Sequence, residues 1–395
     1  MKTNILAKLL VPEASGKWQT PVGANFLFRA VSGLQPLFLK LSELESRQLR
    51  AKLKNIKIIR PVYICGIARS GTTITLEMFH QHPDAGNHFY YHMPVPFLPH
   101  WWECLISSLP VPVFQPVERI HKDGLMVTRD SPDAVEEMLW MAFFNGLHDE
   151  NCSNILGSEV RNERFEAFYK EHIQKLLWNQ NKKRYITKNN YNVTRLEYIA
   201  RLFPDAVFLL VIRNPINHIA SLMKQHRLFT EMTQKDSYLH KTLGIIGHFE
   251  FGPNLAFINP GNTETIHRIR RLFAEGRHVR GWAVYWEAIY RFIAERLEQN
   301  SALKKAGLVV RYEDLCRNPS ETIDRIIQHI GFSADKFKEV KKQYVARLAE
   351  PRYYRPDFSD VELADIQEIT GETAKRFGYD LAAAAASGHM PVNSL

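Results

Sequence analysis

The sequence predicts an α/β fold in which helices cover both faces of a parallel β-sheet. Three apolar runs, PVYICGI (61–67), AVFLLVIR (206–213) and GLVVRYEDL (307–315), each precede a segment with helical spacing. Continuous apolar runs are typical of strands buried on both faces of a parallel sheet. The shorter run RYIT (184–187) predicts a further strand. Strands that alternate with helices along the chain indicate the same layered arrangement.

The predicted helices carry start and stop signals. Asn214 can cap a helix whose first residue is Pro215, since a side-chain oxygen there accepts from free backbone N–H groups. NPSETIDRIIQHIGF (318–332) repeats this start, and Gly331 predicts its end. In VTRLEYIARLF (193–203) the apolar residues recur at helical spacing.

The chain reads as one large α/β unit with additions. Residues 1–55 predict a helical N-terminal extension, and residues 56–382 predict the main domain. Two long segments interrupt its rhythm, about 84–180 and 225–282, and their aromatic residues suggest a substrate pocket. The low-complexity tail 383–395 is predicted to be disordered.

The net charge and the cysteine content limit the classes of binding partner and the cellular compartment that the sequence predicts. The 395 residues include 51 Lys and Arg against 42 Asp and Glu, a net charge of +9, which favours anionic partners. Nucleic acid is not expected, because no basic stripe carries interleaved stacking aromatics. The four cysteines have no zinc-site spacing, which favours a reducing, cytoplasmic location.

The N-terminus is a poor secretory signal, and no run approaches the ~20 apolar residues that cross a bilayer. ANFLFRAVSGLQPLFLKL (24–41) is the most lipid-like segment, although Arg29, Gly33 and Pro36 interrupt it. We expect it to pack on the core. Peripheral membrane contact is the alternative. The sequence predicts no oligomeric state.

The segment CGIARSGTTIT (65–75) forms a glycine-bearing loop between a predicted strand and a predicted helix. Gly66 and Gly71 have the spacing of a nucleotide-phosphate loop, but Thr72 stands where such loops carry lysine. Backbone N–H groups and the helix start favour a bound anion. The sequence has neither that lysine nor a carboxylate motif for magnesium. The loop is therefore predicted to bind a phosphate that is joined to a less highly charged group, and transfer of that group is expected to need no metal.

Four motifs together resemble those of the sulfotransferases that use 3′-phosphoadenosine 5′-phosphosulfate (PAPS). GIARSGTT resembles their 5′-phosphosulfate loop, and VIRNPINHIAS resembles their 3′-phosphate motif. YITKNN is similar to the lysine-containing segment of tyrosylprotein and many bacterial members. VVRYEDLCRNP and HIGF resemble later elements. The matching segments, about 60–90 and 185–335, occur in the family's order.

The resemblance implies a P-loop-like three-layer sandwich with a central parallel sheet, PAPS as co-substrate, and direct in-line sulfuryl transfer to a hydroxyl or amine without a metal. It implies that Lys188 and Arg69 stabilise the leaving phosphate. The implied nucleotide-binding residues are Arg69, Ser70, Gly71, Thr72, Thr73, Arg213, Ser221 and Tyr312.

At the position expected for the general base, the sequence departs from the family pattern. Tyrosylprotein sulfotransferases have a glutamate a few residues after this motif, whereas here no acid closely follows His82-Pro83-Asp84. The candidates, in order of preference, are His92, His88, and then Glu136 or Glu137. An unperturbed histidine titrates near neutral pH, which suits a base. Arg119 and Lys122 belong to the same acceptor region and could meet an anionic substrate.

The aromatic content of the two long segments favours a small-molecule or lipid-like hydroxyl acceptor over a sugar. Two other functions stay open at this point. One is a nucleotide-binding protein of the same fold that performs no transfer, and the other is an ATP-dependent phosphotransferase.

Overall fold

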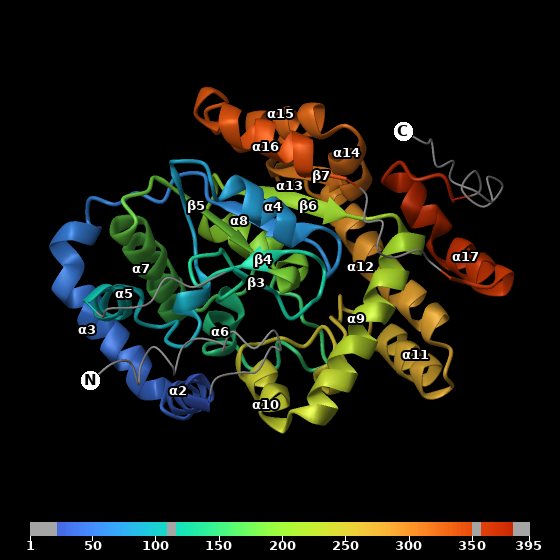
Figure 1. The fold of residues 1–395 in the computed structure, drawn as a ribbon, viewed down its shortest axis with the longest axis horizontal. Helices are drawn as coiled ribbons and strands as arrows, with labels where there is room; N and C mark the ends of the chain where they lie inside the picture. Colours follow the sequence, from blue (N-terminus) through green and yellow to red (C-terminus); the bar gives the residue numbers. More distant parts are fainter. Residues whose placement is uncertain (1–21, 109–115, 350–356, 382–395) are drawn as a thin grey trace.

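The computed structural model describes residues 22–108, 116–349 and 357–381, and the predicted tail 383–395 lies outside them. A five-stranded parallel sheet with the strand order β2-β5-β1-β6-β7 forms the centre (Figure 1). Its strands are β1 (Val62–Cys65), β2 (Ala85–Gly86), β5 (Arg184–Lys188), β6 (Val207–Ile212) and β7 (Gly307–Arg311). A separate antiparallel ribbon pairs β3 (Val117–Glu118) with β4 (Met126–Val127).

Successive side chains of a strand point to opposite faces, and both faces of this sheet are apolar. Tyr63 and Phe208 lie in one buried cluster, which includes residues of α7 (Glu163–Asn179), α8 (Leu196–Leu202), α9 (Pro215–Lys235) and α12 (His278–Gln299). Ile64 and Leu209 lie in the opposite cluster, which includes residues of α4 (Thr72–Phe79), α15 (Pro319–Ile330) and α16 (Lys338–Arg347). The predicted α/β fold with a central parallel sheet flanked by helices is therefore confirmed.

The local signals act as expected, although some elements are shorter. Asn214 Oδ1 accepts a hydrogen bond from the backbone N–H of Ile216 at the start of α9. Gly331 ends α15 in the left-handed region at φ 70°. The run GLVVRYEDL is a strand only to Arg311, because α14 (Tyr312–Arg317) follows directly. Other described elements are α6 (Glu136–Met141), α13 (Ser301–Ala306), α17 (Asp360–Arg376), η1 (Tyr90–His92), η2 (Asn190–Thr194), η3 (Gly252–Asn254) and η4 (Asp335–Phe337).

The N-terminal helices α2 (Val22–Gly33) and α3 (Gln35–Leu53) pack against the main domain. Lys175 of α7 pairs with Glu45 of α3 at 2.9 Å, and both side chains are buried. Breaking one partner of such a buried pair typically costs about 3–5 kcal/mol, so this contact fixes α3 to α7. On the other side of α2 and α3, Phe26, Leu34 and Leu37 are exposed. Membrane contact through this segment stays a prediction.

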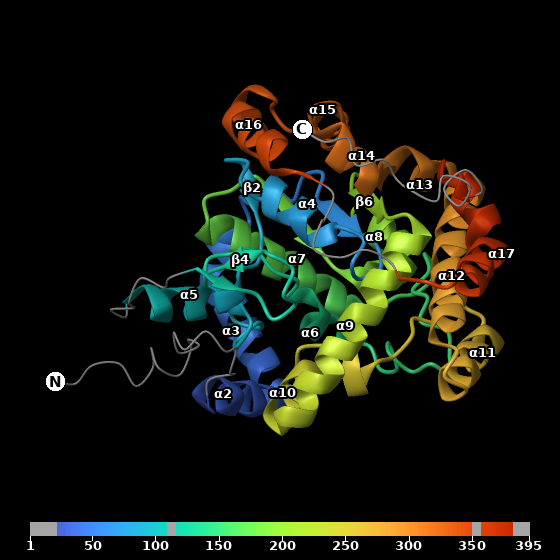
Figure 2. The ribbon, with the colours of Figure 1, turned by 45° about the vertical axis from the view of Figure 1, so that its right-hand side comes forward.

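The segment 225–282 comprises the end of α9, α10 (Ser237–Ile245), η3, α11 (Thr263–Ala274) and the start of α12. α10 lies beside α2 (Figure 2), at the end of the molecule opposite α15 and α16. The other long segment contains α5 (Pro99–Ser108), which packs on α7. Among the described residues, no helix has the length and apolar character that a membrane span requires.

Candidate active site

The predicted nucleotide-binding residues lie at the carboxyl edge of the sheet. The glycine-bearing loop follows β1, Lys188 ends β5, Arg213 follows β6, and Tyr312 follows β7. In open parallel sheets this edge is where ligands bind. The topology therefore brings together groups that are up to 243 residues apart in the sequence, from Arg69 to Tyr312.

Gly71 and Tyr312 fix the shape of the loop. Gly71 has φ 106°, a conformation in which a side chain is strained, and it forms the N-cap of α4. A Cβ atom at this position would lie 2.4 Å from Cδ2 of Tyr312. The Arg213 guanidinium lies over the Tyr312 ring, 5.2 Å from its centroid. Arg213 also donates to the Arg69 carbonyl at 3.4 Å, so Tyr312 and Arg213 both contact the loop.

Arg69 joins the two predicted phosphate sites. Its φ is 72°, which is uncommon for a residue with a side chain. Its Nε donates to Oγ of Ser221 at 3.3 Å, and Ser221 is buried on α9. The predicted 5′-phosphosulfate loop and the predicted 3′-phosphate residue thus meet through one side chain.

Asp123, in the turn between β3 and β4, holds two arginines at the loop. It pairs with Arg69 at 2.7 Å and with Arg119, whose Nε lies 2.9 Å from Oδ1. Burial alone would raise the Asp123 pKa, but the two arginines hold it far below its ordinary value. Arg119 also donates to Thr73 at 3.3 Å, so it lies at the loop itself. Lys122 is exposed in the same turn.

Lys188 lies among charged groups of both signs. Burial lowers its pKa most strongly, whereas the charges of Asp133 and Glu250 raise it. Arg119 and Arg69 lower it further. Lys188, Arg69 and Arg119 therefore interact electrostatically with one another, and Lys188 also interacts with the carboxylates of Asp133 and Glu250.

Asn190 connects the loop to one of these carboxylates. Its Oδ1 accepts from the Thr72 hydroxyl at 3.4 Å, and its Nδ2 donates to Glu250 Oε1 at 2.7 Å. Glu250 Oε2 lies 3.4 Å from His248 Nδ1. We did not predict Asn190, Glu250, Asp123 or Asp133 from the sequence. Only Asn190 carried a signal, because it lies two residues after the predicted catalytic lysine, in the quoted segment YITKNN.

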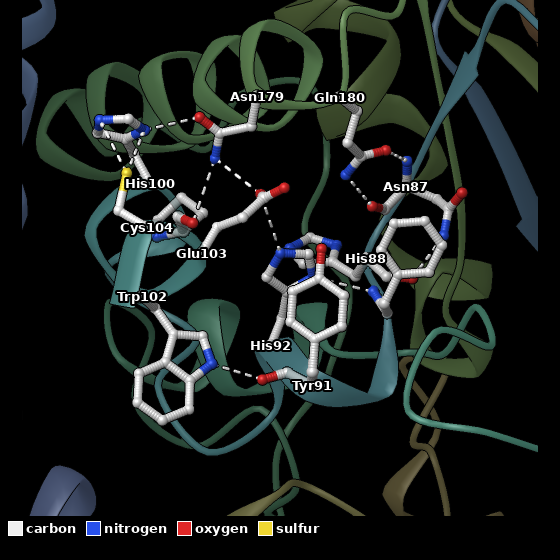
Figure 3. Close-up of polar contacts among 12 residues, drawn as sticks. Asn87, His88, Tyr91, His92, His100, Trp102, Glu103, Cys104, Asn179 and Gln180 are labelled. Atoms are coloured by element: carbon white, nitrogen blue, oxygen red, sulfur yellow. Dashed lines mark hydrogen bonds and ion pairs between the residues drawn. The ribbon is translucent and has the colours of Figure 1, made fainter. Parts of the chain in front are cut away.

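Figure 3 shows His92, the preferred base, beside Glu103. Its Nδ1 accepts from the Phe89 backbone N–H at 3.0 Å, and its Nε2 lies 3.8 Å from Glu103 of α5. Burial lowers its pKa, against the opposing effect of Glu103. With Nδ1 occupied and only 1% of the residue exposed, this imidazole is poorly placed to receive a proton from a substrate.

His88 belongs to a buried hydrogen-bond chain. Its Nε2 lies 2.8 Å from Nε2 of His172, and its Nδ1 lies 3.2 Å from the Tyr185 hydroxyl. That hydroxyl donates to Glu136 Oε1 at 2.7 Å. Burial lowers the pKa of both histidines, so they are neutral and one ring donates to the other.

Glu136 and Glu137 are also engaged inside the protein. Glu136 accepts from Tyr185 and from Tyr169. Glu137 accepts both arms of Arg195 at 2.8 Å and pairs with His148 at 2.7 Å. None of these contacts tests catalysis, so the four base candidates stay predictions. Their contacts favour structural roles.

The structure describes no group of three His, Cys, Asp or Glu side chains arranged to hold a metal, within its described ranges. All four cysteines are free. Metal independence nevertheless remains a prediction.

Replacing Glu136 with Gln should change how stability depends on pH. Burial raises the pKa of Glu136 from its ordinary value of about 4.5 to about 7, although hydrogen bonds from two tyrosines oppose the rise. The folded protein therefore retains this proton while the unfolded chain releases it, and stability falls as pH rises through this window. Glu136→Gln has no proton to lose. Its stability relative to wild type should rise with pH by up to about 3 kcal/mol.

Urea unfolding of both proteins between the two pKa values and above them measures this difference. The wild type supplies the control, because its other titrating groups are common to both proteins. Parallel stability profiles would show that Glu136 is already ionised in the folded protein.

Comparisons with known proteins agree with this architecture. A model described as "Sulfotransferase family" matches residues 61–246, whereas no curated protein sequence matches the chain. The solved structure of sulfotransferase STF9 from Mycobacterium avium aligns over 85% of this chain and 82% of the STF9 chain, with 15% identity and a TM-score of 0.50. This likeness concerns the fold.

Two further solved structures are more distant by TM-score. Sulfotransferase STF1 from Mycobacterium tuberculosis H37Rv covers 90% of each chain at 16% identity and a TM-score of 0.47. A sulfotransferase from Alicyclobacillus acidocaldarius covers 82% of this chain and 99% of its own, at 14% identity and 0.37. The matched segment 61–246 contains the loop, Lys188, Arg213 and Ser221. The part of the chain that matches the sulfotransferase family model therefore holds these predicted site residues.

Proposed function

We propose that the protein transfers the sulfuryl group of PAPS directly to the hydroxyl, or amine, of a small-molecule or lipid-like acceptor. The observation that carries the proposal is the 3.3 Å contact between Arg69 and Ser221. It joins the loop suited to a 5′-phosphosulfate to the helix suited to a 3′-phosphate. A nucleotide with phosphate groups at both positions fits this pair of sites better than ATP does.

The transfer forms one bond and breaks one. The acceptor oxygen attacks sulfur, the bond from sulfur to the bridging oxygen breaks, and its electron pair remains on the 5′-phosphate. Lys188 and Arg69 stabilise the charge that develops on this oxygen. Preorganised donors of this kind act strongly in a site that excludes water. The backbone N–H groups at the start of α4 hold the phosphosulfate.

Aromatic side chains support an apolar or aromatic acceptor. The His248 ring stacks on Phe229 with centroids 4.9 Å apart and an interplanar angle of 10°. Phe251 packs on the same phenylalanine at 5.7 Å. These rings lie beside Glu250, in the segment predicted to meet the acceptor. We expect the reaction in the cytoplasm, in keeping with the four free cysteines.

Arg213→Ala should weaken binding of adenosine 3′,5′-bisphosphate while leaving binding of adenosine 5′-monophosphate nearly unchanged. A lost hydrogen bond to a charged group costs about 1–3 kcal/mol, so the expected loss is at least about fivefold. Calorimetry of both ligands measures it. Arg227→Ala removes an exposed arginine from the same helix and serves as the control. An unchanged ratio of the two affinities in Arg213→Ala would remove Arg213 from the 3′-phosphate site.

Lys188→Ala should lower turnover by about 10²–10³ and weaken nucleotide binding far less, because the charge that it stabilises develops only in the transition state. Transfer from radiolabelled PAPS is measured with excess chelator throughout, and wild-type activity should persist there. Lys183→Ala, an exposed lysine before the opposite end of β5, is the control. Wild-type turnover in Lys188→Ala would make Lys188 dispensable, and activity that requires magnesium would favour phosphotransfer.

A further inference from the structure

Glu250 is held at a defined position relative to the phosphosulfate loop. Thr72 donates to Asn190, and Asn190 donates to Glu250, at 3.4 and 2.7 Å. Two hydrogen bonds therefore separate this carboxylate from the loop where the sulfuryl group is expected. Asn190 follows Lys188 by two residues, so the same strand end positions both the lysine and the carboxylate.

One oxygen of Glu250 remains available. Oε1 accepts from Asn190, whereas the buried Oε2 has no hydrogen-bond donor among the described residues. His248 Nδ1 lies 3.4 Å from Oε2, and neither atom has a hydrogen-bond partner among the described residues. A buried carboxylate oxygen without a hydrogen bond is costly, and a substrate hydroxyl that donates to it would satisfy it.

The other carboxylate near Lys188 is more fully engaged. Asp133 Oδ1 accepts from the backbone N–H of Ala134 at 2.7 Å. The hydroxyl of Tyr90 also hydrogen-bonds to the Asp133 side chain. Of the two carboxylates that act on Lys188, Glu250 thus has the freer oxygen.

We propose that Glu250 is the catalytic base, taking the proton of the acceptor hydroxyl on Oε2 as the acceptor oxygen attacks sulfur. This inference rests on the proposed sulfuryl transfer. The proton moves from the acceptor to Glu250, and the electron pair of the broken sulfur–oxygen bond leaves with the 5′-phosphate. The chemical balance requires no further reactant.

The surroundings keep Glu250 ready to accept a proton. Burial alone would raise its pKa, but His248, the Lys188 charge and the hydrogen bond from Asn190 outweigh burial, so the pKa lies below its ordinary value. The hydroxyls of Tyr191 and Tyr285 also face this charge, and their pKa values are raised mainly by burial. Glu250 is therefore ionised at neutral pH, as a base must be.

The position of Glu250 also indicates the acceptor class. His248 and Phe251 flank Glu250 on both sides in the sequence and pack around Phe229. Flat aromatic rings beside a carboxylate suit an acceptor whose hydroxyl is attached to an aromatic ring. Phenols are therefore the appropriate probes.

The test compares two phenols as acceptors in wild type and in Glu250→Gln. Phenol keeps its proton in mildly alkaline buffer, whereas 4-nitrophenol is largely ionised there and needs little help from a base. Glu250→Gln should lower turnover of phenol by about 10²–10⁴ and that of 4-nitrophenol much less. Its affinity for adenosine 3′,5′-bisphosphate should match wild type, which also shows that the variant is folded.

Two further variants sharpen the result. Glu250→Asp keeps a carboxylate with a shorter reach and should recover part of the phenol rate, and it replaces Glu250→Gln if the amide fails to fold. Glu275→Gln changes an exposed acid in the same segment and should behave as wild type.

Equal losses for both phenols, or no loss, would overturn the assignment of Glu250. It is equally overturned if the wild type binds the bisphosphate but transfers sulfuryl to neither phenol. A wild type that does not bind the bisphosphate would instead count against the proposed function itself.

Discussion

The candidate site depends on the placement of Arg69. Its backbone adopts a left-handed conformation between two glycines, and its side chain bridges Ser221 of α9 and Asp123 of the β3–β4 turn. One residue thus connects the loop, the helix that follows β6 and the turn of a distant ribbon. Arg213 also donates to the carbonyl of Arg69, so Arg69 connects the two predicted phosphate sites.

The buried acids Glu136 and Glu137 hydrogen-bond to residues of β5 and of the segment that follows it, at this edge of the sheet. Glu136 holds Tyr185 of β5, the strand that ends at Lys188. Glu137 accepts from Asn189, the residue between Lys188 and Asn190, as well as from Arg195. Two residues predicted as alternative bases therefore support the backbone that positions the lysine and the asparagine. Their burial excludes water, which favours a structural role over proton exchange with a substrate.

Local sequence patterns predicted the sheet and its helices, whereas contacts between distant segments could not be predicted from the sequence. Apolar runs and caps such as Asn214 identified β6, α9 and the sheet, because burial and capping are read within a few residues. The loop was recognisable from the spacing of its glycines, and Arg213 was predicted from the family resemblance. His92 stays a predicted base, although its ring lies beside Glu103. Glu250 comes from a segment without regular pattern, and only folding places it beside Asn190.

The central claim is that the site binds a nucleotide with phosphates at both the 5′ and 3′ positions and does so without a metal. Calorimetry of the wild-type protein with adenosine 3′,5′-bisphosphate and with ATP, each in excess chelator, tests this most directly. The account predicts one site at which the bisphosphate binds at least about tenfold more tightly than ATP, a difference of about 1.4 kcal/mol or more. Equal or tighter binding of ATP, or bisphosphate binding that appears only with added magnesium, would contradict it.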